Sequence, residues 1–415
     1  MKPVRLRAAH APVARAAPRA APAFPLRLLA TVPHRMFFAQ AMALLLVAVL
    51  GWAWTMAARA GWVAGPTTGA AQPSWHLLAM LYGFLPFFMF GFLFTAGPRW
   101  LDVPAPRPAL WRPAGVAALA GAATMLLAPG EALARAGAAV HGVAWLALAA
   151  AFARLFAASR VRDRGHAGVV LAAMLAGASG PLAYAASGDA AYPWLAFAGL
   201  WLFAVPVFVA VCHRMIPFFT ANVLPTIAIF RPWWLLAALL GGPLAHGTLE
   251  AAGARGWTGI VDVPLALLAL DLARRWGLAQ SFANRLLAML HVGFVWYGVA
   301  FALYAVSSLT TLADRGALGS APAHALALGY CGSLMLAMVS RVTFGHAGRT
   351  LAADRLTWAL FLLLQATVVV RVAAALWPAP WLLAFAALLW ALCAAPWALR
   401  NLPIYARARR DGRAG

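Results

Sequence analysis

The sequence has few acidic residues, few charged residues of either sign and only three cysteines. Asp and Glu account for 10 of its 415 residues, charged residues for 10% and hydrophobic residues for 64%. Because a soluble domain carries about 25% charged residues, this composition excludes a secreted, cytosolic or disordered protein. It predicts an all-α fold, a polytopic integral membrane bundle whose helices cross the bilayer.

The cysteines exclude several kinds of site. Cys212, Cys331 and Cys393 each lie within an apolar run, and neither CxxC nor CxxCH occurs. The sequence therefore supports no disulfide framework, no zinc ribbon and no covalently attached c-type haem. We expect all three side chains to be small buried hydrophobic groups.

Basic residues are in large excess. Lys and Arg number 32, and the formal net charge is +22. A nucleic-acid-binding protein can carry such a charge, but its basic residues would cluster on one hydrophilic face. Here they interrupt apolar stretches, which is typical of membrane topology signals, so we expect no nucleic-acid partner.

Twelve apolar segments approach or reach membrane-spanning length. They lie at about 36–58, 76–97, 113–129, 134–156, 167–187, 193–212, 232–248, 259–274, 284–308, 321–343, 356–376 and 380–400. On the side of the N-terminus, the tail and every second connection hold 27 of the 32 Lys and Arg, whereas the opposite connections hold four and Arg371 lies within a span. Cytoplasmic connections are enriched in basic residues, so this alternation predicts twelve spans with both termini cytoplasmic.

Three regions follow from this count. Residues 1–33 are predicted to be a disordered basic cytoplasmic tail, residues 34–404 a twelve-helix transmembrane domain and residues 405–415 a second basic cytoplasmic tail. No connection exceeds about 20 residues. Any chemistry is therefore expected within or beside the bilayer, and lipid is the first expected partner.

Histidine is the ionisable residue that enters the spans, whereas the acidic residues fall near predicted outer ends. An ionisable residue at membrane depth is costly unless it has a partner, so each is a functional candidate. Neutral imidazole binds metal ions and haem iron. The histidines predicted in the outer half are His76, His141, His246 and His324.

Other histidines lie nearer the cytoplasm. His291 is expected roughly 12 Å deep from that side, at about 1.5 Å per residue. His213 and His346 fall at helix ends, and His34 and His166 are expected to be solvated. For every membrane histidine the sequence leaves open whether it is a ligand or a hydrogen-bonding residue between helices.

Some motifs suggest binding chemistry beyond single histidines. His246 and Glu250 are at i, i+4 on one helical face, which is the arrangement of a metal ligand with its orienting carboxylate, or of an ordinary helix end. Met80, Met335 and Met338 are candidate soft copper ligands or packing residues.

Arginines mark two segments at the predicted cytoplasmic edge. Cys212–Asn222 contains Arg214 beside a proline, and Ser340–Arg349 contains Arg341 and Arg349 among glycines. Guanidinium groups bind carboxylates through paired hydrogen bonds, as haem propionates would require. Anchoring in the positive-inside pattern explains the same residues.

Several segments resemble one family's signature. The first is Trp75-His-Leu-Leu-Ala-Met-Leu-Tyr-Gly-Phe84, followed by Gly91-Phe-Leu-Phe-Thr-Ala-Gly-Pro-Arg-Trp100. The others are Arg214-Met-Ile-Pro-Phe-Phe-Thr220, Leu290-His-Val-Gly-Phe-Val-Trp296 and His324-Ala-Leu-Ala-Leu-Gly329, which continues to Arg349. Spread in order between about residues 34 and 400, these segments resemble the NnrS family.

That resemblance implies a multi-pass protein of the bacterial inner (cytoplasmic) membrane that contains haem b and copper and takes part in nitric oxide metabolism and the nitrosative stress response. The metal-ligating and cofactor-binding positions that it implies are His76, His291, His324 and His346, with Arg214, Arg341 and Arg349. His246 is a further metal candidate from the residues alone. Many members carry a second histidine and a glutamate where this chain has Leu78 and Ala79.

Three functions remain open at this point. The first is haem binding, with or without copper, in nitric oxide handling, with nitric oxide as a small gaseous ligand. The second is a membrane transporter or exporter without a redox centre, in which broken helices near 232–274 line the substrate path. The third is a non-catalytic assembly or sensing subunit. No quinone or nucleotide motif indicates an electron donor, and the sequence leaves open whether the protein is an enzyme.

Overall fold

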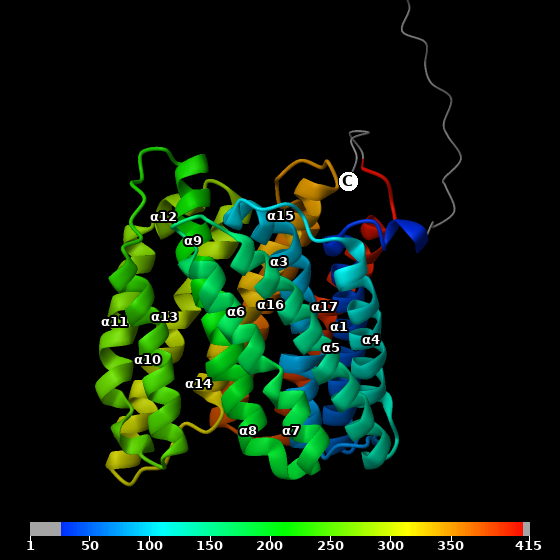
Figure 1. The fold of residues 1–415 in the computed structure, drawn as a ribbon. Coiled ribbons are helices and arrows are strands. Elements are labelled where there is room, and N and C mark those ends of the chain that lie inside the picture. Colours follow the sequence, from blue (N-terminus) through cyan, green and yellow to red (C-terminus); the bar gives the residue numbers. More distant parts are fainter. Residues whose placement is uncertain (1–25, 410–415) are drawn as a thin grey trace, which may run out of the picture.

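The structure, a computed structural model, describes residues 26–409, which form a helical bundle without strands (Figure 1). The predicted all-α polytopic membrane fold is confirmed. Residues 1–25 of the predicted N-terminal tail and residues 410–415 of the C-terminal tail lie outside the described residues.

The helices are α1 (Pro33–Arg59), α2 (Gln72–Leu77), α3 (Leu85–Leu101), α4 (Pro108–Leu127), α5 (Glu131–Ala158), α6 (Gly165–Gly177), α7 (Ser179–Ser187), α8 (Tyr192–Phe197), α9 (Val205–Val223), α10 (Trp233–Ala251), α11 (Gly259–Arg275), α12 (Leu278–Ser281), α13 (Arg285–Leu312), α14 (Ala321–His324), α15 (Ser333–His346), α16 (Arg355–Leu376) and α17 (Pro380–Tyr405). The π-helical segments are η2 (Leu78–Gly83), η4 (Ala198–Ala204) and η6 (Ala325–Gly332), and the short 3₁₀ helices are η1 (Leu26–Leu28), η3 (Gly188–Ala191) and η5 (Arg255–Trp257).

Ten helical segments of the described chain are long and apolar enough to cross a membrane. One of them, Gly165–Val223, has 59 residues, which is too long for one crossing at about 1.5 Å per residue. It turns back near η3, between α7 and α8 (Figure 1). Dividing this segment there gives two segments, and α10, which packs beside α9 and α11, is one more. The bundle of residues 26–409 thus has twelve segments that each run from one end to the other, which we call rods. The number of crossings itself stays a prediction.

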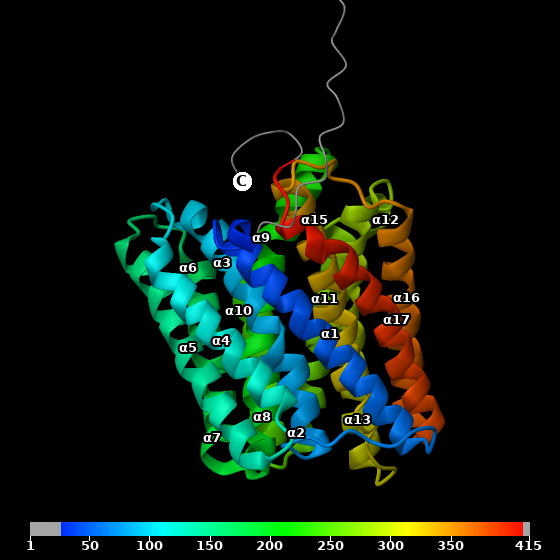
Figure 2. The ribbon, with the colours of Figure 1, turned by 90° about the vertical axis from the view of Figure 1, so that its right-hand side faces the viewer.

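The chain enters and leaves the bundle at the same end. Arg35 near the start of α1 donates hydrogen bonds to the carbonyl oxygens of Tyr405 and Arg407 at distances of 3.3 and 2.8 Å. α1 packs along α17 on one side and contacts α4 on the other (Figure 2). The rods therefore make an even number of passes. We call this the terminal end and its opposite the far end; the cytoplasmic location of the terminal end stays a prediction.

Three interior rods share one design. Rod 1 is α2–η2–α3, rod 2 is α8–η4–α9 and rod 3 is α14–η6–α15. Each starts at the far end with a short helix that has a proline in its first turn (Pro73, Pro193 or Pro322), then changes to π-helix and continues as α-helix. The design recurs at every fourth rod, although the sequence shows no fixed-period repeat. π-Helical turns are rare and concentrate at functional sites.

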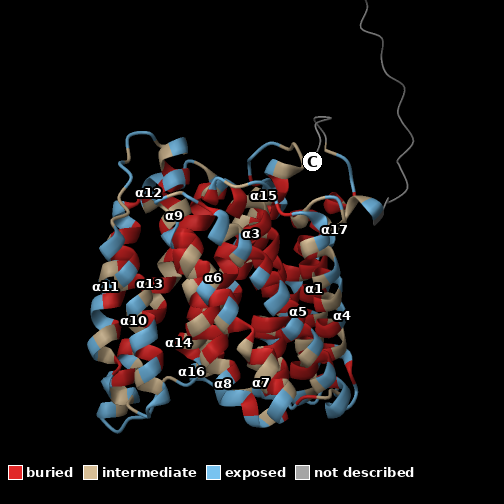
Figure 3. Ribbon diagram, in the orientation of Figure 1, coloured by how far each residue is buried: buried red, intermediate tan, exposed pale blue. Residues whose placement is uncertain are grey.

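The interior rods form much of the core. In the most apolar stretch of rod 1, 83% of residues are buried, and in rod 3 72%, compared with 33% in α16. Buried residues accordingly gather in the middle of the bundle in Figure 3, and exposed ones at its periphery. Tyr82 of η2 joins two rods, because its hydroxyl donates to the Leu195 carbonyl of α8 at 2.8 Å.

The periphery is apolar as well. Leu127, Val143 and Leu267, on three different helices, are each more than 60% exposed although their side chains are large and apolar. Water would make such a surface unfavourable, whereas lipid makes it favourable. The exposed side chains thus agree with a bundle that faces lipid on its sides.

α4 and α5 approach most closely through two glycines. A Cβ atom on Gly121 would lie 2.4 Å from the backbone nitrogen of His141, and one on Gly137 would lie 2.4 Å from that of Met125. Small residues allow membrane helices to approach this closely, where van der Waals contact replaces the hydrophobic effect as the force that holds helices together.

We predict that Gly121→Ala lowers the free energy of unfolding in detergent by about 1–3 kcal/mol, because backbone atoms cannot move aside as a flexible side chain can. Gly241→Ala in α10 is the matched control, since a Cβ there meets nothing within 4 Å. Thermal unfolding of the two purified variants measures the difference. Equal stability of both would show that the α4–α5 contact is looser than described.

Candidate metal and cofactor sites

His76 of rod 1 and His324 of rod 3 meet near the far end. Their ring centroids are 6.0 Å apart, and their ring planes differ by 21°. His76 is the next-to-last residue of α2 and His324 the last residue of α14, so each directly precedes a π-helical segment. The shared design of the two rods therefore places both imidazoles at one level of the bundle.

The nitrogens of this pair are available for a ligand. Nδ1 of His324 donates to the Ser320 carbonyl at 2.8 Å. A carbonyl only accepts, so the lone pair of the neutral ring is on Nε2. A histidine that binds a metal commonly donates its other nitrogen in this way. Nδ1 of His76 is buried and has no hydrogen-bond partner.

Aromatic and cationic side chains surround the pair. The Trp52 ring of α1 lies 4.1 Å from His76, and Trp75 stacks behind Trp52 at 6.4 Å. Arg371 of α16 donates to the Ser320 hydroxyl at 3.1 Å, and its charge acts on both imidazoles. Its Nη1 is buried without a hydrogen-bond partner. Flat walls and an unused guanidinium N–H suit a planar ligand that carries carboxylates.

Haem iron fits the donor atoms of this pair. Two neutral imidazoles with ring centroids 6.0 Å apart are donors of the kind that haem iron accepts. Bis-histidine ligation of this kind needs no further protein donor. Because Trp52 lies against His76, a macrocycle enters only if that indole moves.

Arg371 lies beside the His76–His324 pair, but the sequence analysis did not select it as a binding residue. The arginines selected from sequence, Arg214, Arg341 and Arg349, all lie at the terminal end of the bundle, opposite the His76–His324 pair. A signal was available, since Arg371 is the only Lys or Arg placed deep inside a predicted span. A charge at that depth is costly and marks a function by default.

The selected arginines make their own contacts. The Arg214 guanidinium lies 4.9 Å from the Trp100 ring centre, and its Nη1 is 3.5 Å from Asp163. Arg341 lies 3.9 Å from the centre of Phe219. Arg349 follows the end of α15. Stacking on aromatic rings stabilises a cation with no anionic ligand present, so packing accounts for Arg341 as it stands.

His291 lies apart from the pair at the far end. It is on α13, in the half nearer the terminal end, and its Nε2 is 2.9 Å from the Thr220 hydroxyl of rod 2. That hydroxyl donates to Ile216, so the imidazole donates to it. No three His, Cys, Asp or Glu side chains among residues 26–409 converge as a metal site, and His291 does not complete one with His76 and His324.

His346 pairs with an unexpected partner. Its ring centroid lies 4.3 Å from that of His34, the second residue of α1. The prediction that His34 is solvated is wrong, because only 4% of the residue is exposed. Burial follows from the packing of α1 on α17, which covers the start of α1. Arg35, Arg99 and Arg409 act electrostatically on His346, so this corner is strongly cationic.

His166 was also expected to be solvated, and this prediction is wrong as well, since it is 1% exposed. Its Nε2 lies 2.9 Å from Nδ1 of His213. His213 donates through Nε2 to the Pro232 carbonyl at 3.2 Å, so for neutral rings His166 is the donor between the two. The remaining nitrogen of His166, Nδ1, faces Asp163 at 3.8 Å. The hydrogen bond to His213 explains why His166 turns inward.

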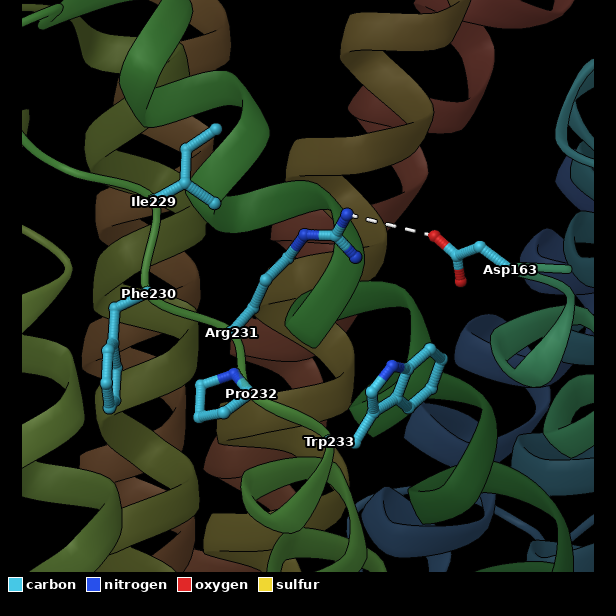
Figure 4. Close-up of a pocket in the computed structure, with 6 residues that line it drawn as sticks. All are labelled: Asp163, Ile229, Phe230, Arg231, Pro232 and Trp233. Atoms are coloured by element: carbon cyan, nitrogen blue, oxygen red, sulfur yellow. Dashed lines mark ion pairs between the residues drawn. The ribbon is translucent and has the colours of Figure 1, made fainter.

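An open pocket of about 420 Å³ adjoins the His166–His213 pair at the terminal end. Figure 4 shows Arg231 reaching toward Asp163 across it, at 3.9 Å, with Trp233 at one side. Asp163 also pairs with Arg214, so its charge is already neutralised. The pocket therefore offers a surface at the membrane edge rather than a buried centre.

A second, apolar cavity of about 40 Å³ lies where the three interior rods meet. Met335, Met338 and Cys212 are among its lining residues. Met80 is not among them, so the three methionines considered as soft copper ligands do not share this cavity. All three cysteines are buried and unpaired, as expected from the sequence.

His141 has no free nitrogen. Its Nδ1 is 3.0 Å from the Ala118 carbonyl and its Nε2 2.9 Å from that of Tyr82. A carbonyl only accepts, so the neutral ring donates to one of the two oxygens and only contacts the other. His141 is a structural residue that holds α5 against α4 and rod 1. Of the four histidines expected in the outer half, two form a pair, His141 is used in packing, and His246 has carboxylate partners.

The nearest carboxylate to His246 is not Glu250, which the i, i+4 spacing along α10 suggested. Its Nδ1 lies 2.7 Å from Asp262 of α11, and Glu250 is 3.9 Å from the other nitrogen, Nε2. The orienting carboxylate is therefore Asp262. Asp262 was expected near an outer end, yet it is 0% exposed, because α10 and α13 cover that face of α11.

Comparison with known families agrees with this arrangement. The family model described as NnrS protein matches residues 28–409. The chain belongs to the NnrS family. No curated protein matches it. In this NnrS-family chain the match covers every rod, and with it both histidines of the far-end pair.

Leu78 and Ala79 occupy the positions where many NnrS proteins are expected to carry a second histidine and a glutamate. Both side chains are fully buried in η2. A metal site that uses that histidine and glutamate would lack them here. A ligand bound by His76 and His324 would therefore have no further donor side chain at positions 78 and 79 of rod 1.

A stability comparison separates ligand histidines from structural ones in this NnrS-family chain. We predict that His141→Leu lowers the free energy of unfolding of the metal-free protein by about 1–3 kcal/mol, because a buried carbonyl loses its donor. His76→Leu is expected to change it by less than about 1 kcal/mol, since Nδ1 of His76 has no partner to lose. Thermal unfolding in detergent tests this; the reverse order would mark His76 as the structural residue.

Proposed function

We propose that this chain is a haem-binding protein of the bacterial cytoplasmic membrane that acts in nitric oxide metabolism or the nitrosative stress response. His76 and His324 would hold the haem iron. The observation that supports this most directly is their geometry: two half-buried imidazoles from different rods, with ring centroids 6.0 Å apart and ring planes 21° apart. Membership of the NnrS family supports the link to nitric oxide.

The chain's own residues prepare this site in three ways. The Ser320 carbonyl fixes the tautomer of His324 and leaves Nε2 as the donor. Trp52 lies against one face of His76, and Trp75 stacks on Trp52. Arg371 supplies a positive charge and an unused N–H group beside both imidazoles, where a propionate would be neutralised.

A bound haem, held by His76 and His324, would supply one-electron redox chemistry or a binding position for nitric oxide. Copper is the second metal implied by the family resemblance. A metal site that needs the histidine and glutamate found in many members would lack them here, at Leu78 and Ala79, so the proposal rests on haem. Whether the chain is catalytic depends on an electron donor, for which no residue has been identified.

Haem stoichiometry of purified variants tests the assignment. We expect His76→Ala and His324→Ala each to lose most of the bound haem, measured by the pyridine haemochrome assay and by reduced-minus-oxidised spectra. His291→Ala and His246→Ala are controls, because neither residue contacts the pair, and both should retain haem. Retention in the first two variants would assign the iron ligands elsewhere; wild-type protein without haem would remove the proposal.

Arg371 gives a second, independent prediction. Arg371→Gln keeps a hydrogen-bond donor for Ser320 but removes the charge, and should weaken haem binding about 10–100-fold, in line with about 1.5–3 kcal/mol for a charge-assisted hydrogen bond. Arg341→Gln, at the terminal end, should leave haem affinity unchanged. Haem titration of apoprotein in detergent compares the two. An equal loss in both variants would point to a general effect on folding.

A further inference from the structure

A second group of ionisable side chains lies near the far end, between α10, α11 and α13. His246 and Glu250 are on α10 and Asp262 is on α11. The rings of Trp201 in η4 and Tyr304 in α13 enclose the imidazole at centroid distances of 4.8 and 4.2 Å. His246 is 1% exposed and Asp262 0%, so both are sealed from lipid.

The tautomer of His246 follows from its partners. Nδ1 lies 2.7 Å from Oδ1 of Asp262, and an ionised carboxylate only accepts, so Nδ1 carries the hydrogen. The lone pair of the neutral ring is then on Nε2. That atom is buried and has no hydrogen-bond partner. A carboxylate behind one imidazole nitrogen and a free lone pair on the other is the usual arrangement of a metal-binding histidine.

Glu250 faces the free nitrogen. Its Oε2 is 3.9 Å from Nε2 of His246, too far for a hydrogen bond. One ion at about 2.0–2.2 Å from each atom spans such a gap. The Glu250 side chain is 35% exposed, so water can reach the same position and complete the coordination of an ion.

The local charge also favours a cation. Asp262 and Glu250 contribute two negative charges, and Arg255, 3.6 Å from Glu250, contributes one positive charge. With a neutral imidazole the group has an excess of one negative charge, within a protein of formal net charge +22. At the His166–His213 pair one carboxylate, Asp163, faces two arginines, and the charges that act on the other two histidine pairs belong to arginines. The His246 group is therefore the one of these histidine sites with a negative surrounding charge, which attracts a cation.

We infer that His246 and Glu250 bind a divalent transition-metal cation, with Asp262 as the carboxylate that orients His246. Imidazole with carboxylate oxygen selects ions such as Zn²⁺ and Cu²⁺ over Mg²⁺ and Ca²⁺. Residues 26–409 contain no group of three or more His, Cys, Asp or Glu side chains placed to hold one ion, so the proposed ion has two protein ligands and water completes its coordination. The site lies apart from the His76–His324 pair and does not rest on the proposed haem function.

Titration with Zn²⁺ alone tests the site. The full chain, purified in detergent and treated with a chelator, is titrated in a calorimeter as wild type, Glu250→Gln and Glu131→Gln. Glu131 is a matched control, because it is also a far-end glutamate paired with an arginine, Arg135 at 3.5 Å, but has no imidazole beside it. We expect Glu250→Gln to weaken one Zn²⁺ site at least 10-fold and Glu131→Gln to leave it unchanged.

Two further variants separate the roles. His246→Gln should abolish this site, and Asp262→Asn should weaken it 10–100-fold, as loss of an orienting partner does in other metal sites. If either variant fails to fold, the Zn²⁺ affinities of Glu250→Gln and Glu131→Gln still decide the question, because Glu250 is partly exposed and we expect its substitution to leave the fold intact. Equal Zn²⁺ affinity in wild type and Glu250→Gln overturns the inference. His76→Leu should keep the Zn²⁺ site whatever its haem content, so the two proposals fail separately.

Discussion

The structure depends on how buried imidazole nitrogens are satisfied in an interior that contains almost no acid groups. A nitrogen that is removed from water without a partner costs about 1–3 kcal/mol, and the spans offer mainly carbonyls, hydroxyls and other imidazoles as partners. His141 uses two carbonyls, His213 a carbonyl and His166, and His291 a hydroxyl. Against this background, a buried nitrogen without a partner is informative. Among the described residues, His76 and His246 near the far end and His34 and His166 at the terminal end each have one.

The shared design of the three interior rods explains why His76 and His324 meet at the far end. A π-helical turn widens the helix and changes the direction of the residues that precede it relative to those that follow. In rods 1 and 3 the preceding residues include His76 and His324. In rod 2 the corresponding helix carries no histidine, and its π-helical segment presents Trp201 to His246 instead. One backbone design thus supports a histidine pair on one side of the core and encloses a single histidine on the other.

Much of the fold could be predicted from the sequence, because apolar length and the alternation of arginines are strong, local signals. Twelve rods and the shared side of the two chain ends follow from them. The partners of the histidines could not be predicted in the same way. His34, His166 and Asp262 all fall near predicted helix ends, where hydropathy implies solvent. Their burial depends on neighbouring helices, α17, rod 2 and α13, that are distant in sequence.

The i, i+4 spacing of His246 and Glu250 along α10 also led to a wrong prediction of the carboxylate that orients His246. His246 and Glu250 share a helical face, which suggested that Glu250 orients the imidazole, but the closer oxygen comes from Asp262 on the next helix. The i, i+4 rule gives a shared face and not the nearest partner. Arg371 is the opposite case: its position inside a span was visible in the sequence, and only the neighbouring rod shows that it lies beside His76 and His324.

The two far-end sites differ most in the charge around them, and this difference separates their ligands. The charge that acts on His76 and His324 is the guanidinium of Arg371, which repels a bare divalent cation but attracts an iron complex that brings its own carboxylates. His246 lies between two carboxylates, which attract a bare cation and repel such a complex. Imidazole alone does not discriminate between these ligands, because it binds both. In both proposals, specificity is therefore set by a group on another helix that is not itself a metal ligand, Arg371 at one site and Asp262 at the other.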